Sequence, residues 1–240
     1  MNAAAAIAAR EFLAHYRTAS GWLIAALFLL LTGAVFTANT LVPGEPASLR
    51  YFFSPAAWLL VVIAPAISMR SFAEEARTGT IEPLLTGPAT DPEVVLGKHA
   101  GSVAFLLSLF LPSLLFPLLL AWAADAPLDL GPIITGYLGL ALVGSTYLAL
   151  GLLVSALTDS QTLAFLAAFL LLTGYLIVTG PTAGQLPAPF DRMAAAAAVQ
   201  PRLADFAKGV LDLGSLVAFG AIQCALLAGS WAAIDARRWR

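Results

Sequence analysis

The residues whose types could do chemistry gather in one polar segment, residues 68–98. Its acids are Glu74, Glu75, Glu82, Asp91 and Glu93, and its bases are Arg70, Arg77 and Lys98. No Cys lies among them, so their types predict neither a Cys-based metal site nor a thiol nucleophile. Mixed charge on a short segment is more typical of a surface that recognises another protein.

Turn residues divide this segment into helices. A helix is expected to leave the second apolar stretch of the chain and to continue over residues 70–77. Gly79 suits the position just after its end, because glycine adopts the left-handed conformation found there. Residues 87–88, a Gly-Pro pair, break the chain again, and a turn over residues 91–98 leads back toward the next apolar stretch.

A second short helix is predicted at residues 80–86, between these two breaks. Thr80 suits its N-cap, and Pro83 falls in its first turn, where the missing N–H costs nothing. Glu82 lies near the positive end of the helix dipole.

Leu84 and Leu85 of this short helix have no obvious core to cover. One interpretation is an amphipathic loop that rests on lipid headgroups. The other is a rigid projection that docks into a groove on a partner. The residues alone leave both open.

No motif elsewhere supplies a catalytic site. His15 and His99 form no cluster with other ligands, and Cys224 is the only cysteine. No G-x-S-x-G sequence is present, and the nearest approach to a phosphate-binding loop, which ends at Lys98, has Pro92 where glycine is required. We therefore expect no catalytic, cofactor-binding or metal-binding residue, no enzyme activity of the chain itself, and no ATP bound by it.

A membrane bundle must position the polar segment. Six stretches contain no Asp, Glu, Lys or Arg: 18–44, 51–69, 99–124, 130–158, 160–190 and 213–234. A helix crosses a bilayer core with about 20 apolar residues, and a composition of 60% hydrophobic and 11% charged residues agrees. The sequence thus predicts an all-α membrane protein. Its six transmembrane helices are expected near 20–40, 55–70, 100–122, 132–156, 162–180 and 213–234.

Lys and Arg give the orientation of these helices. With a cytoplasmic N-terminus, eight of these residues fall inside and four outside, so both termini are expected in the cytoplasm. Arg237, Arg238 and Arg240 flank Trp239 just past the last stretch and suit the headgroup region. A net charge of −2 excludes a nucleic-acid surface.

Two flanking regions are expected to lie along the membrane rather than across it. Residues 1–19 predict an N-terminal interfacial helix, centred on residues 7–17. Its apolar side chains Ile7, Phe12, Leu13 and Tyr16 would face lipid, and Arg10, Glu11 and Arg17 would face water. The external loop, residues 181–212, predicts short helices near 192–199 and 202–211.

The spans themselves carry no Asp, Glu, Lys or Arg, which argues against an ion-coupled carrier and a voltage sensor. Their polar residues are expected to form hydrogen bonds between helices. These are Ser145, Thr146, Tyr147, Ser155, Thr32, Asn39, Ser108, Thr173, Tyr175 and Gln223. The prolines and glycines Pro65, Pro112, Pro117, Gly144 and Gly151 predict helix kinks.

Three motifs resemble a known family. Glu74-Glu75, Gly79-Thr80, Glu82 and Leu84-Leu85, followed by Pro88 and by Leu96-Gly97-Lys98, are similar to the cytoplasmic signature of ABC-2 type transporter permeases. Residues 65–75, 136–165 and 205–212 resemble the branch called gliding-motility-associated ABC permeases. The resemblance runs from about residue 10 to residue 240.

The resemblance implies a single transmembrane domain, residues 1–240, made of the interfacial helix 1–19, helices 1–5 in 20–180, the external loop 181–212, and helix 6 with a cytoplasmic tail in 213–240. A coupling helix, 80–86, would dock onto a separate ABC ATPase that binds ATP and Mg. The residues implied in ATPase coupling are Glu74, Glu75, Gly79, Thr80, Glu82, Leu84, Leu85, Pro88 and Lys98. A second cytoplasmic contact would be Thr158, Asp159 and Ser160. Pro83 departs from the plain helix former that relatives often carry, which would shift the contact toward Leu84 and Leu85.

The expected function is that of the permease subunit of an ABC exporter in the cytoplasmic (inner) membrane of a prokaryote, moving an unidentified substrate. The implied partners are two ATPase copies and a second permease subunit, most simply in a homodimer, together with membrane lipid. An envelope accessory protein is a further candidate partner. An alternative stays open: a non-transporting membrane anchor that transmits ATPase motion to a cell-envelope machine. A polar pathway between subunits would favour transport, and a large external docking surface would favour the anchor.

Overall fold

The computed structural model describes residues 3–41, 48–80, 89–123, 129–180, 187–188 and 190–238, and all regular structure among them is helical. The helices are α1 (Ala3–Arg17), α2 (Ala19–Asn39), α3 (Arg50–Ser68), α4 (Ala73–Thr78), α6 (Asp91–Ser113), α7 (Leu115–Ala123), α8 (Leu130–Leu157), α9 (Gln161–Thr179), α10 (Phe190–Ala197), α11 (Val199–Phe206) and α12 (Leu213–Arg238). Among the described residues, six helical segments are long and apolar enough to cross a membrane: α2, α3 with α4, α6 with α7, α8, α9 and α12. The predicted all-α bundle of six spans is confirmed.

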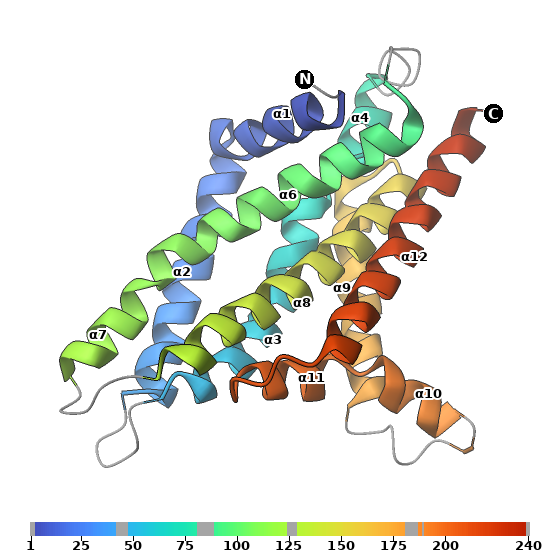
Figure 1. Ribbon diagram of the computed structural model, residues 1–240. Helices are drawn as coiled ribbons and strands as arrows, with labels where there is room; N and C mark the ends of the chain where they lie inside the picture. Colours follow the sequence, from blue (N-terminus) through green and yellow to red (C-terminus); the bar gives the residue numbers. More distant parts are fainter. Residues whose placement is uncertain are drawn as a thin grey trace.

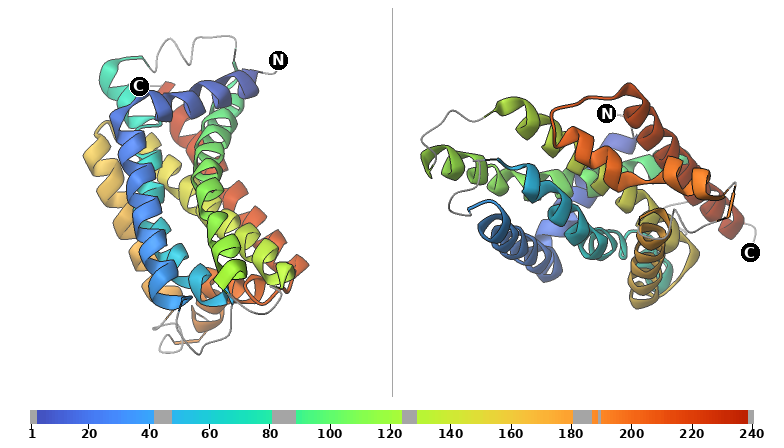
Figure 2. Two further views of the ribbon diagram at one scale, coloured as in Figure 1. Left: turned by 90° about the vertical axis from the view of Figure 1, so that its left-hand side faces the viewer. Right: turned by 90° about the horizontal axis from the view of Figure 1, so that it is seen from below.

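The long helices run side by side, and α1 lies across one end of them (Figure 1). We call this end, which also holds α4 and both termini, the α1 end. The opposite end, where α10 and α11 lie, is the α11 end. A side view shows α1 crossing from the top of α2 to the top of α6 (Figure 2).

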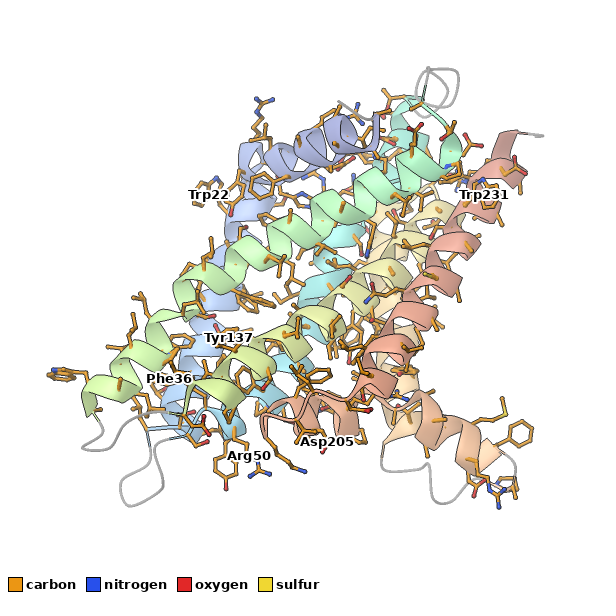
Figure 3. The ribbon with its side chains drawn as sticks, viewed as in Figure 1. Trp22, Phe36, Arg50, Tyr137, Asp205 and Trp231 are labelled. Atoms are coloured by element: carbon orange, nitrogen blue, oxygen red, sulfur yellow. The ribbon has the colours of Figure 1, made fainter. Side chains whose placement is uncertain are left out.

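Aromatic side chains fill much of the core. Phe52 and Phe53 of α3 pack against Tyr137 of α8 with ring centroids 6.4 and 5.4 Å apart. Phe36 of α2 stacks on Phe116 of α7 at 4.7 Å. The sticks in Figure 3 show Tyr137 inside the bundle and Trp22 on its outer surface. Lipid solvates the apolar outer faces about as well as another helix does. The close packing of buried aromatic rings therefore contributes much of the energy that holds the helices together.

The third span begins earlier than predicted, at Asp91 rather than near residue 100. The Glu93 carboxylate accepts hydrogen bonds from the Thr90 N–H at 2.9 Å and from its hydroxyl at 2.8 Å. This capping box starts a helix, and Pro92 in the first turn is compatible with it. Residues 91–98 are therefore the first two turns of α6 rather than a turn of a loop.

The kink predicted from proline in the third span is confirmed, since α6 ends at Ser113 and α7 starts at Leu115. Pro117 has no N–H to offer the Ser113 carbonyl, four residues earlier. The Tyr137 hydroxyl of α8 donates to that carbonyl instead, at 2.8 Å. A side chain from another helix thus replaces the missing backbone donor.

By contrast, α8 runs without interruption from Leu130 to Leu157, through Gly144 and Gly151. Its glycines allow close packing. A Cβ atom at Gly136 would lie 2.2 Å from the Phe53 ring, and one at Gly151 would lie 1.9 Å from Ser68 Oγ. These glycines therefore let α3 pack closely against α8.

Helix α1 packs on protein more than the prediction of an interfacial helix implied. Ile7, Phe12 and Tyr16 lie against the buried clusters of the bundle, whereas Leu13 is exposed. Glycines of α6 allow the approach: a Cβ at Gly101 would be 2.7 Å from the Ala8 carbonyl. The prediction that Ile7, Phe12 and Tyr16 face lipid was thus wrong.

At the α11 end, the two short helices span residues 190–197 and 199–206, not 192–199 and 202–211. The chain leaves α11 early because Gly209 adopts a φ of 89°. The Val210 N–H donates back to the Asp205 carbonyl at 3.0 Å, which closes the turn. Residues 181–186 and 189 of this loop lie outside the described residues.

Asp212 then caps α12. Hydrogen bonds from the Ser215 hydroxyl and from the backbone N–H groups of Gly214 and Ser215 hold the pKa of the Asp212 carboxyl below its ordinary value.

We expect Gly136→Ala to lower stability by about 1–3 kcal/mol, because the fully buried Phe53 ring cannot move aside. The denaturation midpoint of the purified protein in detergent measures the effect. The matched control is Gly174→Ala in α9, whose Cβ would meet nothing within 4 Å. Equal midpoints for the two variants would contradict the close packing of α3 on α8.

Candidate functional site

The predicted coupling residues lie at the α1 end, but the structure describes only part of them. Gly79 and Thr80 end the described segment 48–80, and the chain is described again from residue 89. The predicted coupling helix, 80–86, with Glu82, Leu84, Leu85 and Pro88, therefore lies outside the described residues apart from Thr80. The structure does describe the residues that flank this predicted helix in the chain, up to residue 80 and from residue 89.

On the N-terminal side of residues 80–86, the helix predicted to continue over residues 70–77 is interrupted. Helix α3 ends at Ser68, and α4 begins at Ala73. Ser155 of α8 closes the gap: its Oγ accepts from the N–H groups of Phe72 and Ala73, both at 3.1 Å, and donates to the Met69 carbonyl at 3.2 Å. The hydroxyl takes the place of the helical bonds that these backbone groups would otherwise make.

Helix α4 ends as predicted at Gly79, which has a φ of 71°. The Thr80 N–H donates to the Glu75 carbonyl at 3.0 Å, a pattern typical of a helix C-terminus with glycine after it. The hydroxyls of Thr78 and Thr80 lie 2.9 Å apart. The chain thus leaves α4 in a defined direction.

A buried ion cluster lies next to α4. Lys98 of α6 is 1% exposed, and its ammonium donates to Glu11 of α1 at 2.6 Å and to Glu75 of α4 at 2.8 Å. It also donates to the Ser71 carbonyl at 2.7 Å and lies 5.1 Å from the centre of the Phe72 ring. We call Glu11, Glu75 and Lys98 the Lys98 cluster.

The cluster joins three separate elements through one charge. A buried ammonium is costly unless its charge and its three donors are matched, and here two carboxylates and one carbonyl match them. Arg10 of α1 adds a second cation, 3.3 Å from the same Glu75 oxygen that Lys98 contacts. Glu75 and Lys98, predicted as coupling residues, are thus paired with each other inside the protein.

Glu74 points the other way. Arg70 donates to it through Nε at 2.7 Å and Nη2 at 3.1 Å, and donates through Nη1 to Ser20 of α2 at 2.7 Å. These contacts connect the segment before α4 to the first turn of α2. Helices α1, α2, α6 and α8 are therefore each tied to α4, to the segment before it or to the Lys98 cluster.

The other predicted contact, Thr158, Asp159 and Ser160, forms the turn between α8 and α9 at the same end. Arg237 of α12 donates to Asp159 at 2.6 Å and to the Ala156 carbonyl at 2.8 Å. Asp159 is nevertheless 71% exposed at its side chain. The turn is fixed by α12 and remains accessible.

Deeper in the bundle, several of the predicted hydrogen bonds between helices are confirmed. His99 of α6, Ser145 of α8 and Gln223 of α12 form a chain, with distances of 3.2 Å at each step. Gln223 also donates to Thr146 at 3.1 Å. Tyr16 bonds Ser108 at 2.6 Å, and Tyr175 donates to the Ala197 carbonyl at 2.5 Å.

Four of the predicted polar contacts were wrong. Thr32 and Asn39 donate to carbonyls of their own helix, those of Phe28 and Val35. The hydroxyls of Tyr147 and Thr173 have no hydrogen-bond partner among the described residues.

Sequence reasoning missed Glu11, which was assigned to the water-facing side of α1. The signal was present in the spacing: Glu11 follows Ile7 by four residues and precedes His15 by four, so all three share one face of the helix. His15 stacks on Phe105 of α6 with ring centroids 4.5 Å apart. An acid on the packed face of a helix predicts a buried cation opposite it.

Among the described residues, no group of three or more His, Cys, Asp and Glu side chains is placed to hold a metal ion. The Lys98 cluster and the hydrogen bonds of Ser155 at the break between α3 and α4 can transmit force between helices. A displacement of α4 or of the start of α6 acts on α1, α2 and α8 through short hydrogen bonds.

Fold and site together define a polytopic helical membrane protein. The Lys98 cluster holds the residues on both sides of the segment between its second and third spans. Residues 5–210 match the family described as "ABC-2 family transporter protein". Since the match covers most of the chain, the chain belongs to that family. It is accordingly a transmembrane permease subunit of an ABC transporter, a family whose permeases work with an ATPase subunit and have no ATP-binding site of their own. No curated protein matches the chain.

We expect Lys98→Met to destabilise the protein by about 3–5 kcal/mol, because it leaves the Glu11 carboxylate without its cation and leaves Glu75 with the exposed Arg10 alone. Thermal denaturation in detergent, together with protease cleavage of α1, measures the loss. Lys208→Met is the matched control, since its pair with Asp205 is exposed and worth about 1 kcal/mol or less. A Lys98→Met protein as stable as the control would show that the cluster does not form.

Ser155→Ala tests the helix break. The change leaves the buried N–H groups of Phe72 and Ala73 without an acceptor, at a cost of about 1–3 kcal/mol. Hydrogen exchange should quicken at these two amides. Thr37→Ala, whose hydroxyl bonds only to its own helix, is the control. Unchanged exchange at residues 72–73 would refute the role of Ser155.

Proposed function

We propose that this chain couples ATP hydrolysis by a separate subunit to export of a substrate across the cytoplasmic membrane of a prokaryote. The observation that carries the proposal is the Lys98 cluster, which ties both ends of the 81–88 segment to α1. Family membership supplies the ATPase partner. The energy for movement would come from that partner, because no motif of this chain binds ATP.

In this proposal the α1 end faces the cytoplasm and residues 80–86 form the coupling helix. Leu84 and Leu85 would enter a groove on the ATPase, and Glu82 and Pro88 would border them. Glu75 and Lys98 brace the segment from inside the permease rather than touching the ATPase. Thr158, Asp159 and Ser160 would make the second contact, which the exposure of Asp159 permits.

Two permease subunits would pair with two ATPases, most simply in a homodimer. Helices α2, α9 and α12 are the least buried of the six spans, so their apolar faces are open to lipid or to a second subunit. Within the family, we place the chain in the gliding-motility-associated branch because residues 65–75, 136–165 and 205–212 are similar to it. Export rather than ion-coupled uptake fits the absence of Asp, Glu, Lys and Arg from the centres of the spans.

A second candidate function is a membrane anchor that passes ATPase motion to a cell-envelope machine. Its support is α10, which projects from the α11 end (Figure 1) and exposes Phe190 at 59% and Met193 at 64%. Large exposed apolar side chains at a bundle end favour contact with another protein or with the membrane interface. An envelope protein that binds α10 would support this candidate.

We expect the tagged chain, purified from its native membrane, to carry an ABC ATPase with it. Changing Leu84 and Leu85 together to Asp should reduce the recovered ATPase at least about tenfold, because charged side chains do not enter an apolar groove. The matched control changes Val210 and Leu211 to Asp, since both are exposed and lie at the α11 end.

The outcomes separate the parts of the proposal. Wild-type protein that brings no ATPase from intact membrane complexes contradicts the proposed coupling. An ATPase that survives the Leu84 and Leu85 changes shows that the docking site lies elsewhere, with Asp159 the next position to test.

A further inference from the structure

The C-terminal end of α12 is attached to two different parts of the α1 end (Figure 1). One attachment is Arg237, which donates through Nη1 to Asp159 at 2.6 Å and through Nε to the Ala156 carbonyl at 2.8 Å. Both acceptors belong to the end of α8 and the turn that follows it. Arg237 thus joins α12 to the predicted second ATPase contact, residues 158–160.

The other attachment is Ile234, one turn before Arg237. Its side chain is 0% exposed and is buried with Phe72, Val94, Val95, Leu152 and Ala156. Phe72 precedes α4 and Val94 lies in the first turn of α6, so the contact flanks the predicted coupling helix on both sides. The Phe72 ring also lies 5.1 Å from the Lys98 ammonium. Ile234 therefore rests on the part of the α1 end that the Lys98 cluster holds together.

These two attachments act at different points along one continuous helix, Leu213–Arg238. Arg237 lies about 4.5 Å beyond Ile234 along the helix axis, whereas Leu213, at the other end, lies about 32 Å away. If the turn after α8 shifts relative to the residues around Ile234, α12 turns about Ile234 as a lever. A shift of about 1 Å at Arg237 then becomes about 3 Å at Cys224 and about 6 Å at Val217.

The middle of α12 offers little resistance to such a turn. Only 17% of its most apolar stretch is buried, the lowest share of the six spans, against 67% for α8. Lipid solvates an apolar helix face equally well after the helix shifts. Gln223 is a polar tie to α8, and it has two acceptors one turn apart, the Leu142 carbonyl at 3.4 Å and Thr146 at 3.1 Å. Gln223 therefore keeps a partner when α12 turns.

At the α11 end, α12 follows an exposed link to α11. Val210 and Leu211 of this link are 52% and 56% exposed, and Asp212 bonds the first turn of α12 itself. Phe219 is buried, with its ring centroid 6.4 Å from that of Phe206 in α11. Helix α11 is thus the neighbour that a turn of α12 reaches at this end.

We propose that α12 is a lever, which pivots at Ile234 and is driven through Arg237 when the ATPase displaces residues 158–160. A small movement at the α1 end is thereby enlarged at the α11 end, where α12 contacts α11. This role of α12 rests on the ATPase contact of the proposed function, whereas the pivot is a property of this chain alone.

The test measures distances between pairs of spin labels in the complex recovered with its ATPase and reconstituted in nanodiscs. Cys224 is the only cysteine of the chain and is exposed, so a label on it reports one position of α12. Val217→Cys in a Cys224→Ser background reports a position nearer the α11 end. Each is paired with Leu30→Cys on α2, since both Val217 and Leu30 are exposed.

Addition of ATP with vanadate should change the Val217 distance about 1.7 times as much as the Cys224 distance, because displacement grows with distance from the pivot. A control pair, Leu30→Cys with Leu107→Cys on α6 in the Cys224→Ser background, should not change, since Arg70 and the Lys98 cluster tie these helices together. Equal changes at the two α12 positions, or none at either, would overturn the lever.

Arg237→Gln should remove most of the change at both α12 positions while the ATPase stays bound, because the lever loses its drive but keeps its pivot. The matched control is Arg17→Gln, which removes an exposed cation at the same end and should leave the change intact. A full response in the Arg237→Gln protein would refute the role of Arg237.

Failure of the lever and failure of the proposed function give different results. If no ATPase is recovered, the proposed coupling is contradicted, and the pivot is decided on the chain alone in nanodiscs. There, Arg237→Gln should widen the distribution of Val217 distances more than that of Cys224 distances, because α12 then turns freely about Ile234. Distributions of equal width in the variant and the wild type would overturn the pivot.

Discussion

The ammonium of Lys98 is the group on which the arrangement of the α1 end depends. It is almost completely buried, and it is stable there only because α1 and α4 each bring a carboxylate to it. Glu11 and Lys98 are 87 residues apart in the chain, so the pair exists only in the folded protein. One side chain thus decides that α1 lies across α6, that α4 faces both, and that the chain leaves α4 where it does.

A second constraint acts on the backbone. Hydrocarbon offers no hydrogen bonds, so a break in a spanning helix needs a donor or acceptor from elsewhere in the protein. The second span is interrupted between Ser68 and Ala73, and Ser155 bonds the backbone groups left open. The third span is interrupted near Pro117, and Tyr137 bonds the carbonyl left open. Both side chains belong to α8, whose own backbone is unbroken.

The six spans could be predicted from the sequence because long uncharged stretches have few other uses. The early start of α6 at Asp91 was also readable, from the local pairing of Thr90 with Glu93. For the Lys98 cluster, the spacing of Glu11 in α1 indicates an acid on the packed face of that helix, but nothing near Lys98 shows that it is the cation which Glu11 meets. Ser155 was predicted to bond between helices, and it does, but the break between α3 and α4 that it bonds was not predicted. Contacts between distant segments left no local pattern in the chain.

The position of these two side chains on α8 has a consequence for the order of events during synthesis. Ribosomes make the chain from its N-terminus, so the second and third spans enter the bilayer before Tyr137 and Ser155 have been translated. Until α8 follows, the open backbone groups at Phe72, Ala73 and Ser113 lack their final partners. The breaks in the second and third spans therefore complete their hydrogen bonds only after the fourth span has been made.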